Sequence, residues 1–438
     1  MLKYTLIMYK RVGMIYVKAW GREIGQLVEH RGVVKFKYSD TNSLDFSPIK
    51  MPVANRQVYE FSHLAYQYGL AGLISDHLPG SYGIDFMDRF IFEHLKRKPT
   101  ILERLQFLGT HTLGALEFHP TYKREDYKKS LDISQLYSES KKLLNHKNKT
   151  DNSSLISLET LIAVSNSAGG GARAKAMVGF NPYDKTISLT RKQGDFPKDY
   201  HPVIIKYDDG DISMYPSLAH KYKDASIPTK LEYMYHLFAK EAGITMSPCE
   251  LLEFDGKAHF LTYRFDRKND ERLHVHSFSG MMHYNPSETY NDFMDMFRVA
   301  NKLNLAQSQK EQIAKIILFN AIFGNRDDHS KNFSFTMDST GKWAFAPAYD
   351  LTYTSNAYHQ MLLKNKMLNR TTFSELAEAF AAYNITESFL KENISKMVDI
   401  KNTKLLNESL NLNIPQEFAL LILQSTKAVD DNFTKMGF

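Results

Sequence analysis

The chain has 438 residues, a formal net charge of +6 at pH 7 and an ordinary share of apolar and charged residues. This length predicts two or more domains, and so small a charge over it is only weak support for nucleic-acid binding. The single cysteine, Cys249, excludes an intrachain disulfide and a Cys-based zinc site, and we expect it to be a buried structural thiol. Neither a secretory leader nor a long apolar run is found, so we expect no membrane span and a cytoplasmic location.

Residues 1–120 are predicted to form one small α+β unit. Three segments alternate apolar and polar residues as strands of an antiparallel meander do, and they lie at 14–20, 24–28 and 33–38. Residues 56–108 are expected to be helical, beginning with 61–70 and broken at Leu78-Pro79-Gly80. Residues 109–118 are a strand candidate bounded by glycine.

A charged segment, 121–155, is predicted to be a solvated linker, although its basic cluster at 141–149 could also meet a phosphate. A second, larger domain is expected from residue 156, with a first part over 156–266 and a mainly helical part over 267–438.

A glycine-rich stretch lies near the start of this second domain. Its notable residues are Gly169, Gly170, Gly171, Ala172, Arg173 and Lys175. Three glycines in a row allow the backbone close to a phosphate, and successive N–H groups could cradle it. A flexible turn between strands would look the same, and no Gly-Lys-Ser/Thr of a Walker A loop follows.

Two charged residues follow in an informative order. Lys206 lies on an apolar strand at 203–207, where a kinase lysine would reach nucleotide phosphates. Glu232 lies in the first turn of a predicted helix over 230–243, as an ion-pair partner for Lys206. The alternative for Lys206 is a strand-end lysine that extends to solvent.

The following hairpin, 247–254 and 258–266, is where a hinge between two lobes is expected, with backbone groups near Tyr263 and Phe265 facing an adenine. Residues 268–310 are expected to be mainly helix and loop, with solvated histidines. These histidines are His274, His276 and His283.

A dense polar stretch, Gly324-Asn-Arg-Asp-Asp-His-Ser-Lys-Asn332, lies after an apolar helix and before a predicted hairpin. Asp327 and Asn332 have the Asp-x-x-x-x-Asn spacing of a protein-kinase catalytic loop. The hairpin returns the chain, so Asp350 can lie close to Asn332 and share a metal ion with it. A polar loop that only caps a helix is the alternative.

The chain resembles the HipA family of bacterial serine/threonine kinases, the toxins of HipA–HipB type toxin–antitoxin pairs. The most specific matches are Asn325-x-Asp-x-His-x-Lys-Asn332 and Gly170-Gly171-Ala172-Arg173-x-Lys175. The others are Leu78-Pro79-Gly80, Leu113–Phe118, Ile205-Lys206, Arg264-Phe265-Asp266-Arg267 and Ala348-Tyr349-Asp350-Leu351.

The resemblance implies roles for individual residues. Asp327 would be the catalytic base, with His329 and Lys331 completing the loop, whereas Asp328 has no required role. Asn332 and Asp350 would bind Mg²⁺, and Lys206 would contact the phosphates of ATP. Family members commonly phosphorylate a serine in their own glycine-rich loop. The expected serine position falls on Ala168, so Ser167 is the candidate for autophosphorylation, with Ser165 as the alternative.

The resemblance further implies an α+β, bilobal protein-kinase-like fold with a mainly helical C-lobe, preceded by the small N-terminal subdomain. ATP and Mg²⁺ would be the cofactors. The partners would be a small helix-turn-helix antitoxin, operator DNA through that complex, and a protein substrate, with an aminoacyl-tRNA synthetase as a family example.

Three other functions share some of these features. A small-molecule phosphotransferase has the same catalytic parts but lacks a module such as residues 1–120. A non-catalytic co-repressor with a kinase fold would not need Asp327, Asn332, Asp350 and Lys206 together. A metal hydrolase using Asp327, Asp328 and His329 would need further ligands, and the sequence has no other ligand cluster.

Overall fold

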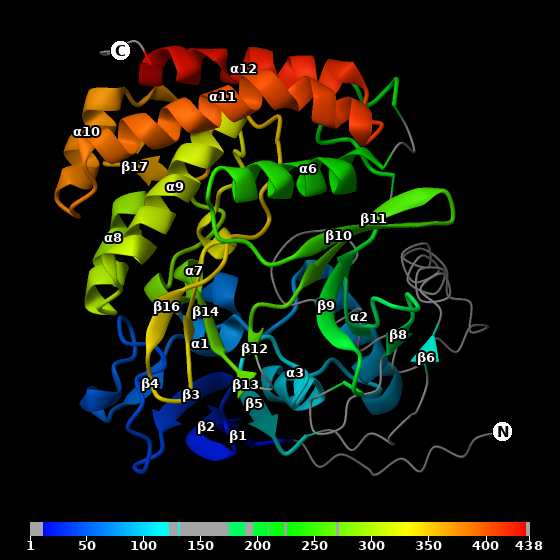
Figure 1. Cartoon of the computed structure of the whole chain (residues 1–438). Coiled ribbons are helices and arrows are strands. Elements are labelled where there is room, and N and C mark those ends of the chain that lie inside the picture. Colours follow the sequence, from blue (N-terminus) through cyan, green and yellow to red (C-terminus); the bar gives the residue numbers. More distant parts are fainter. Residues whose placement is uncertain are drawn as a thin grey trace.

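The computed structural model describes residues 12–121, 130–131, 175–188, 196–208, 210–222, 226–268 and 271–434. Figure 1 shows the blue N-terminal part at the bottom, a green sheet beside it, and orange and red helices at the top.

The N-terminal part is a five-stranded antiparallel sheet in the order β4-β3-β2-β1-β5. Its strands are β1 (Met14–Ala19), β2 (Arg22–His30), β3 (Val33–Tyr38), β4 (Val58–Glu60) and β5 (Glu117–His119). The predicted meander is present, and on β1 the apolar residues Ile15, Val17 and Ala19 are buried. The helices are α1 (Gly72–Ser75), α2 (Ser81–Leu95) and α3 (Ile101–Leu108), and α3 packs on β1 and β5.

Two predictions for this part are wrong. Residues 61–70 contain only a single 3₁₀ turn, η2 (Ala65–Gln67), which ends because Tyr68 and Gly69 both adopt a left-handed backbone, with φ of 58° and 71°. Of the strand expected at 109–118, only the end is a strand, β5. The rest is a loop whose carbonyls receive hydrogen bonds from arginines outside this part of the chain.

The second sheet is six-stranded, antiparallel between its paired strands, in the order β10-β11-β9-β7-β8-β6. Its strands are β6 (Ser130–Leu131), β7 (Lys175–Phe180), β8 (Ile187–Ser188), β9 (His201–Lys206), β10 (Cys249–Phe254) and β11 (Lys257–Tyr263). Helix α6 (Ile227–Glu241) packs on β10 and β11. The strand β6, within the segment predicted as a linker, is paired with β8.

The remaining part is mainly helical and holds a large apolar core. Its helices are α7 (Phe278–Met282), α8 (Phe293–Lys302), α9 (Gln307–Phe323), α10 (Phe373–Ala381), α11 (Glu387–Asn411) and α12 (Gln416–Thr434). Helix α9 is buried from Ile313 onward beneath α11 and α12 (Figure 1). Among the described helices, none is long and apolar enough to cross a lipid bilayer.

Short strands and 3₁₀ turns lie among these helices. A three-stranded sheet consists of β14 (His274–Ser277), β15 (Ser334–Met337) and β16 (Trp343–Phe345), in that order. The two-stranded pairs are β12 (Arg267–Lys268) with β13 (Glu271–Arg272), and β17 (Leu362–Leu363) with β18 (Lys366–Met367). The 3₁₀ turns are η1 (Val53–Asn55), η4 (Ser330–Asn332) and η5 (Leu368–Arg370).

The prediction of solvated histidines is wrong for His274 and His276, which lie fully buried on β14. Each imidazole has a partner in the N-terminal part, because Nε2 of His274 lies 3.1 Å from the carbonyl oxygen of Phe46 and Nδ1 of His276 lies 2.7 Å from Asp76. Burial is tolerated when such polar groups have partners.

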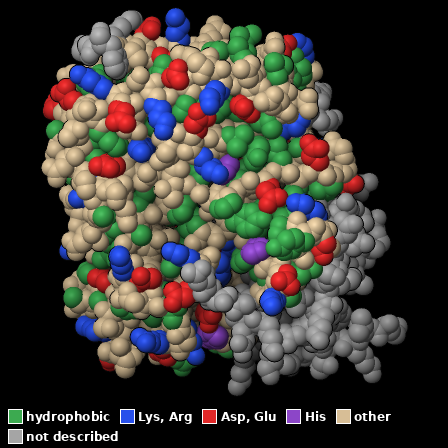
Figure 2. All heavy atoms as spheres, in the orientation of Figure 1, with side chains coloured by type: hydrophobic (Ala, Val, Ile, Leu, Met, Phe, Trp, Pro, Cys, Tyr) green, Lys and Arg blue, Asp and Glu red, His purple; other side chains and the backbone are tan. Residues whose placement is uncertain are grey.

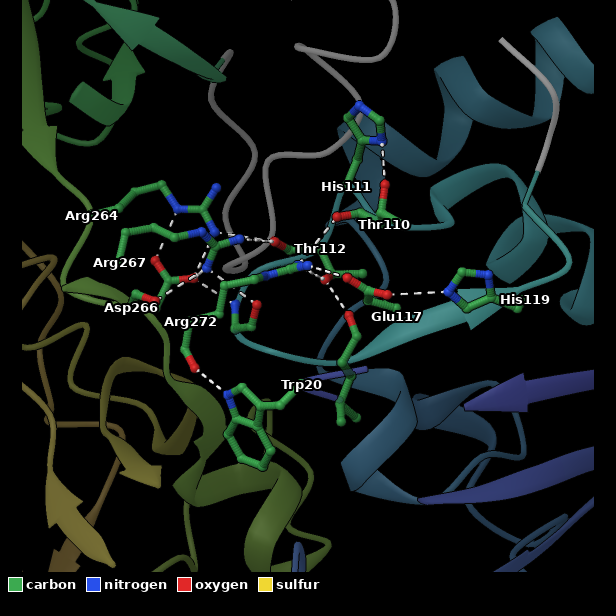
Figure 3. A network of polar contacts seen from close by, with 12 residues as sticks. Trp20, Thr110, His111, Thr112, Glu117, His119, Arg264, Asp266, Arg267 and Arg272 are labelled. Atoms are coloured by element: carbon green, nitrogen blue, oxygen red, sulfur yellow. Dashed lines mark hydrogen bonds and ion pairs between the residues drawn. The ribbon is translucent and has the colours of Figure 1, made fainter. Parts of the chain in front are cut away.

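Besides the contacts of these histidines, two further contacts between the N-terminal part and the rest bear on the site. In the first, shown in Figure 3, three arginines hold the loop between α3 and β5. Arg264 and Arg267 donate to the carbonyl oxygen of Thr112, and the carboxylate of Asp266 binds both guanidiniums and the N–H of Gly114. Arg272 donates to the carbonyl of Thr110 and to Glu117.

The second contact is between α1 and α7. A Cβ atom added to Gly72 would lie 2.0 Å from the carbonyl oxygen of Gly280, and one added to Gly280 would lie 2.3 Å from a carboxylate oxygen of Asp76. At Gly72 the two short helices therefore meet backbone against backbone, whereas the space beside Gly280 is taken by the side chain of Asp76.

Candidate phosphoryl-transfer site

The predicted catalytic loop begins where α9 ends. Gly324 has a left-handed backbone with φ of 69°, which terminates the helix after Phe323. The last carbonyls of α9 are bound by buried side chains: Lys401 Nζ donates to Ile322 at 2.7 Å, and the hydroxyl of Tyr235 donates to Phe323 at 2.5 Å. The start of the loop is therefore anchored in the core.

Asp327 and Asn332 lie close together within this loop. The side-chain amide of Asn332 donates to the backbone carbonyl of Asp327 at 2.7 Å. Because its NH₂ group is used in this bond, the amide oxygen of Asn332 is the atom left to face a cation. Burial raises the pKa of Asp327; the charge of His329 opposes this effect, and the negative charge of Asp350 adds to it.

The neighbouring acid, Asp328, has a different environment. It is fully buried and accepts hydrogen bonds from His359 Nδ1 at 2.7 Å and from the N–H of Gln360 at 2.8 Å. Asp328 therefore holds the segment at 359–360 against the loop. Among the described residues, no group of three or more His, Cys, Asp or Glu side chains is placed to hold a metal ion, as a hydrolase built on Asp327, Asp328 and His329 would require.

Lys206 joins the sheet to this loop. Its Nζ forms ion pairs with Glu232 on α6, as predicted, and with Asp350. Burial alone would lower the pKa of Lys206, but the two carboxylates raise it well above its usual value. Asp350 is half-buried, which would raise its pKa, yet Lys206 and then Lys175 hold that pKa far below the usual range.

Lys175 is a further cation at this position. It begins β7 and lies directly opposite Lys206 in the antiparallel pairing with β9. The charge of Lys175 favours the ionised form of Asp327 and of Glu232. Burial opposes this effect more strongly, so the pKa of both carboxyls lies above its usual value. Two lysines and three carboxylates thus share one electrostatic environment.

Four of these five residues, Lys175, Lys206, Glu232 and Asp350, border a pocket between the second sheet and the helical part, whereas Asp327 and Asn332 are not among its lining residues. Its charged lining includes Lys175, Lys206, Glu232, Lys331 and Asp350. Its apolar lining includes Ile204, Met246, Ala348 and Leu351. Cys249 also lines this pocket. Burial raises the pKa of its thiol to about 12, so the thiol stays neutral at neutral pH.

The predicted hinge residues Tyr263 and Phe265 line the same pocket. The N–H of Tyr263 donates to the carbonyl of Pro248 at 3.0 Å, and the N–H of Arg264 donates to Pro202 at 3.0 Å. Of the two backbone groups of Tyr263, only the carbonyl can therefore face a ligand. The ring of Phe265 stacks on Tyr349, with centroids 5.9 Å apart.

The side chains around the pocket fit ATP and Mg²⁺, the cofactors that the sequence implies. The carboxylate of Asp350 and the amide oxygen of Asn332 are hard oxygen ligands of the kind that Mg²⁺ prefers, and the lysines match phosphate charge. The predictions for Gly169, Gly170, Gly171, Ala172, Arg173, Ser165 and Ser167 lie outside the described residues.

The N-terminal part also contributes to the pocket, which sequence reasoning missed. The contributing residues are Asp76, His77, Leu78, Gly80 and Leu113. The Leu78-Pro79-Gly80 motif could have pointed to this region, but no periodicity relates it to a pocket formed by residues some 200 positions away.

Comparisons with known proteins cover nearly the whole chain. A family model described as the HipA-like C-terminal domain matches residues 167–404, and one described as the HipA N-terminal domain matches residues 15–119. "Putative kinase Y4mE" of Sinorhizobium fredii (strain NBRC 101917 / NGR234) is 28% identical over 163 residues. That match spans 34% of this chain and only 38% of the relative.

Among solved structures, the chain is similar to one from the "Shewanella oneidensis MR-1 Toxin Antitoxin System HipA, HipB and its operator DNA complex". The TM-score is 0.65 at 15% identity, over 96% of this chain and 97% of that chain. The Helicobacter pylori proinflammatory kinase CtkA gives a TM-score of 0.32 at 12% identity, over 52% of this chain and 93% of that one. The α+β, kinase-like fold is thus shared with the Shewanella structure, and with two matching family models the chain belongs to the HipA family.

Proposed function

We propose that this protein is an ATP-dependent serine/threonine protein kinase and the toxin of a toxin–antitoxin pair. The observation that carries the proposal is the position of Lys206, which contacts Glu232 on α6 and Asp350 beyond the catalytic loop. A lysine from a sheet, a glutamate from the adjoining helix and a metal-binding aspartate are the parts that a protein kinase aligns around nucleotide phosphates.

Each residue has a role in this proposal. The carbonyl of Tyr263 and the N–H of Phe265 face the adenine, and Lys206 with Lys175 binds the phosphates. Asn332 and Asp350 hold Mg²⁺, which would neutralise phosphate charge when bound. Asp327 accepts the proton of the attacking hydroxyl, a task for which its raised pKa is favourable because a stronger base takes the proton more readily.

The proposed partners are a small helix-turn-helix antitoxin and, through it, operator DNA, in line with the assembly in the Shewanella structure. Figure 2 shows acidic and basic side chains mixed over the face in view, so the described residues of this face offer no basic patch to DNA. The proposed substrate is a protein of the translation machinery, such as an aminoacyl-tRNA synthetase. A small-molecule phosphotransferase is the second candidate, but the contribution of the N-terminal part to the pocket favours a larger substrate.

The test is Asp327→Ala, assayed by transfer of radiolabelled phosphate from ATP to the protein itself or to a bacterial extract. We expect transfer to fall by at least about 10²-fold, because the base is lost. Asp399→Ala, which changes an exposed carboxylate on α11, is the matched control and should keep full activity.

Thermal unfolding of both variants should stay cooperative, which separates loss of chemistry from loss of fold. Expression of the wild-type chain without an antitoxin should arrest growth, and Asp327→Ala should not. Undiminished phosphate transfer by a folded Asp327→Ala protein would show that Asp327 is not the base.

A further inference from the structure

An aspartate of the N-terminal part, Asp76, reaches into the site at the end of α1. Its carboxylate accepts three hydrogen bonds from strand β14, which lies outside the N-terminal part. The donors are Nδ1 of His276 at 2.7 Å, the N–H of Ser277 at 2.8 Å and the hydroxyl of Ser277 at 2.7 Å. Burial disfavours its charge, yet these donors and the nearby charge of Lys331 keep its pKa below the usual value.

The contacts of Asp76 continue to the catalytic loop in two short steps. Ser277 caps α7 through its hydroxyl, which accepts from the N–H of Gly280 at 2.9 Å. The next residue, Phe278, donates its N–H to the carbonyl of Phe333 at 2.7 Å. Phe333 directly follows Asn332, the proposed metal ligand.

The same region is fixed from the sheet side. Ser277 is paired with Ser334 where β14 runs beside β15. The hydroxyl of Tyr349 bonds to Ser334 Oγ at 2.6 Å and donates to the carbonyl of Lys331 at 2.8 Å. The segment 331–334 is therefore held from two sides, by the junction that Asp76 forms with Ser277 and by Tyr349.

A hydrolytic role for this cluster is a poorer interpretation. Asp76, His276 and Ser47 are aligned like an Asp–His–Ser triad, with Nε2 of His276 lying 3.1 Å from Ser47 Oγ. Ser47 is fully buried, however, so no substrate can reach its hydroxyl. Asp76 and Ser277, in contrast, line the pocket of the proposed kinase site together with Lys331.

We propose that Asp76 is a positioning residue of the phosphoryl-transfer site: it fixes α7 and the end of the catalytic loop, and so places Asn332 for the metal ion. Only the last step, in which Asn332 is placed for a metal ion, rests on the proposed function. The proposal assigns the N-terminal part a share in building the site, in addition to any part in recognition.

The test uses two variants of the full-length protein that disturb Asp76 in different ways. Asp76→Asn removes the charge at nearly constant size. Gly280→Ala keeps the charge of Asp76 but adds a methyl group that would lie 2.3 Å from its carboxylate, so the carboxylate must move. Alanine is otherwise favoured in a helix. The matched control is Asp88→Ala, which removes another aspartate of the N-terminal part that is paired only within it, to Arg104.

The first measurement is equilibrium binding of a fluorescent ATP analogue during titration with Mg²⁺. We expect both test variants to need about tenfold more Mg²⁺ for half-maximal binding, the size of effect that partners of metal ligands usually have. Binding of adenosine, which carries no phosphate, should be unchanged, and Asp88→Ala should match the wild type. A variant that is merely less stable would weaken both ligands together.

The second measurement is hydrogen exchange of the amides in 330–334 without nucleotide. Both variants should raise exchange there relative to Asp88→Ala. This result needs no kinase activity, so it would hold even if the proposed function fails. If the segment exchanges as in the wild type and the Mg²⁺ requirement is unchanged in folded Gly280→Ala protein, Asp76 does not position the loop. If Asp76→Asn does not fold, Gly280→Ala alone decides the matter.

Discussion

Lys206 and Asp350 lie 144 positions apart in the chain, yet their side chains form an ion pair in the pocket between the lobes. Glu232 shares the same ammonium group, so one cation balances two buried carboxylates. In the proposed function, the phosphates of ATP would compete with these carboxylates for Lys206, and the ion pair would keep Lys206 and Asp350 aligned before the nucleotide arrives.

The first prediction concerns this shared cation. Lys206→Met should weaken ATP binding and abolish phosphate transfer, while adenosine binding stays close to that of the wild type. Without the lysine, two carboxylates remain close together and the pKa of Asp350 rises. Isothermal titration with ATP and with adenosine measures the difference.

The control for this variant is Lys185→Met in the turn between β7 and β8, where the lysine is exposed and paired to Glu250. We expect it to bind both ligands like the wild type. Equal losses for ATP and adenosine in Lys206→Met would argue that the lysine supports the fold of the pocket and does not bind phosphates.

The second prediction concerns the arginine cluster of Figure 3. Asp266→Ala leaves the guanidiniums of Arg264 and Arg267 and the N–H of Gly114 without their carboxylate. Removing one partner of a buried ionic network should lower the free energy of unfolding by about 3–5 kcal/mol. Urea denaturation measures this loss, and hydrogen exchange of residues 110–117 should increase.

An exposed ion pair provides the comparison. Glu378→Ala breaks the pair with Lys364, and we expect a change below about 1 kcal/mol because solvent screens that pair. A loss in Asp266→Ala as small as that of Glu378→Ala would mean that the cluster contributes little to docking of the N-terminal part.

The third prediction concerns acid stability and His259, which is fully buried on β11. Its Nδ1 accepts the N–H of Asp208 at 3.1 Å, which requires an unprotonated ring. Burial lowers its pKa from 6.5 to about 4. Between these values the unfolded chain binds a proton that the folded protein does not, so stability is present above pH 6.5 and is lost as the pH falls toward 4.

The contribution of His259 to this loss is on the order of 3 kcal/mol for a shift of this size. His259→Asn keeps an acceptor near the position of Nδ1 without a titrating ring. Its free energy of unfolding should fall less steeply than that of the wild type between pH 6.5 and 4, as measured by urea denaturation at several pH values. Parallel curves for the two proteins would contradict the assignment.

Residues that carry their signal locally were predicted well from the sequence. Lys206 and Glu232 could be paired because each lies on an element with clear periodicity and the order of the elements is that of a kinase lobe. The Asp327–Asn332 spacing likewise lies within one loop. Asp328 was set aside because the motif requires no acid there, and in the structure it is bound to His359 and Gln360.

Residues whose role depends on distant partners were missed. The sequence predicts His276 as solvated because no local pattern around it indicates burial. Its burial depends on Asp76, which lies 200 positions away. The segment 109–118 is predicted as a strand because glycine bounds it, but most of it is a loop, and the arginines that hold its backbone come from beyond residue 263. Tertiary hydrogen bonds of this kind leave no trace in local periodicity.

The close approach of Gly72 and Gly280 has a consequence for how members of this family can diverge. A side chain at position 72 would collide with the backbone of Gly280, so that position cannot be enlarged unless α7 shifts, whereas a methyl group at position 280 would displace the carboxylate of Asp76. Hybrid proteins that join the first 120 residues of one homologue to the remainder of another should therefore succeed only when both parents keep the same spacing between these helices. The two parts of the chain would then be inherited as a matched set, even though each has a core of its own.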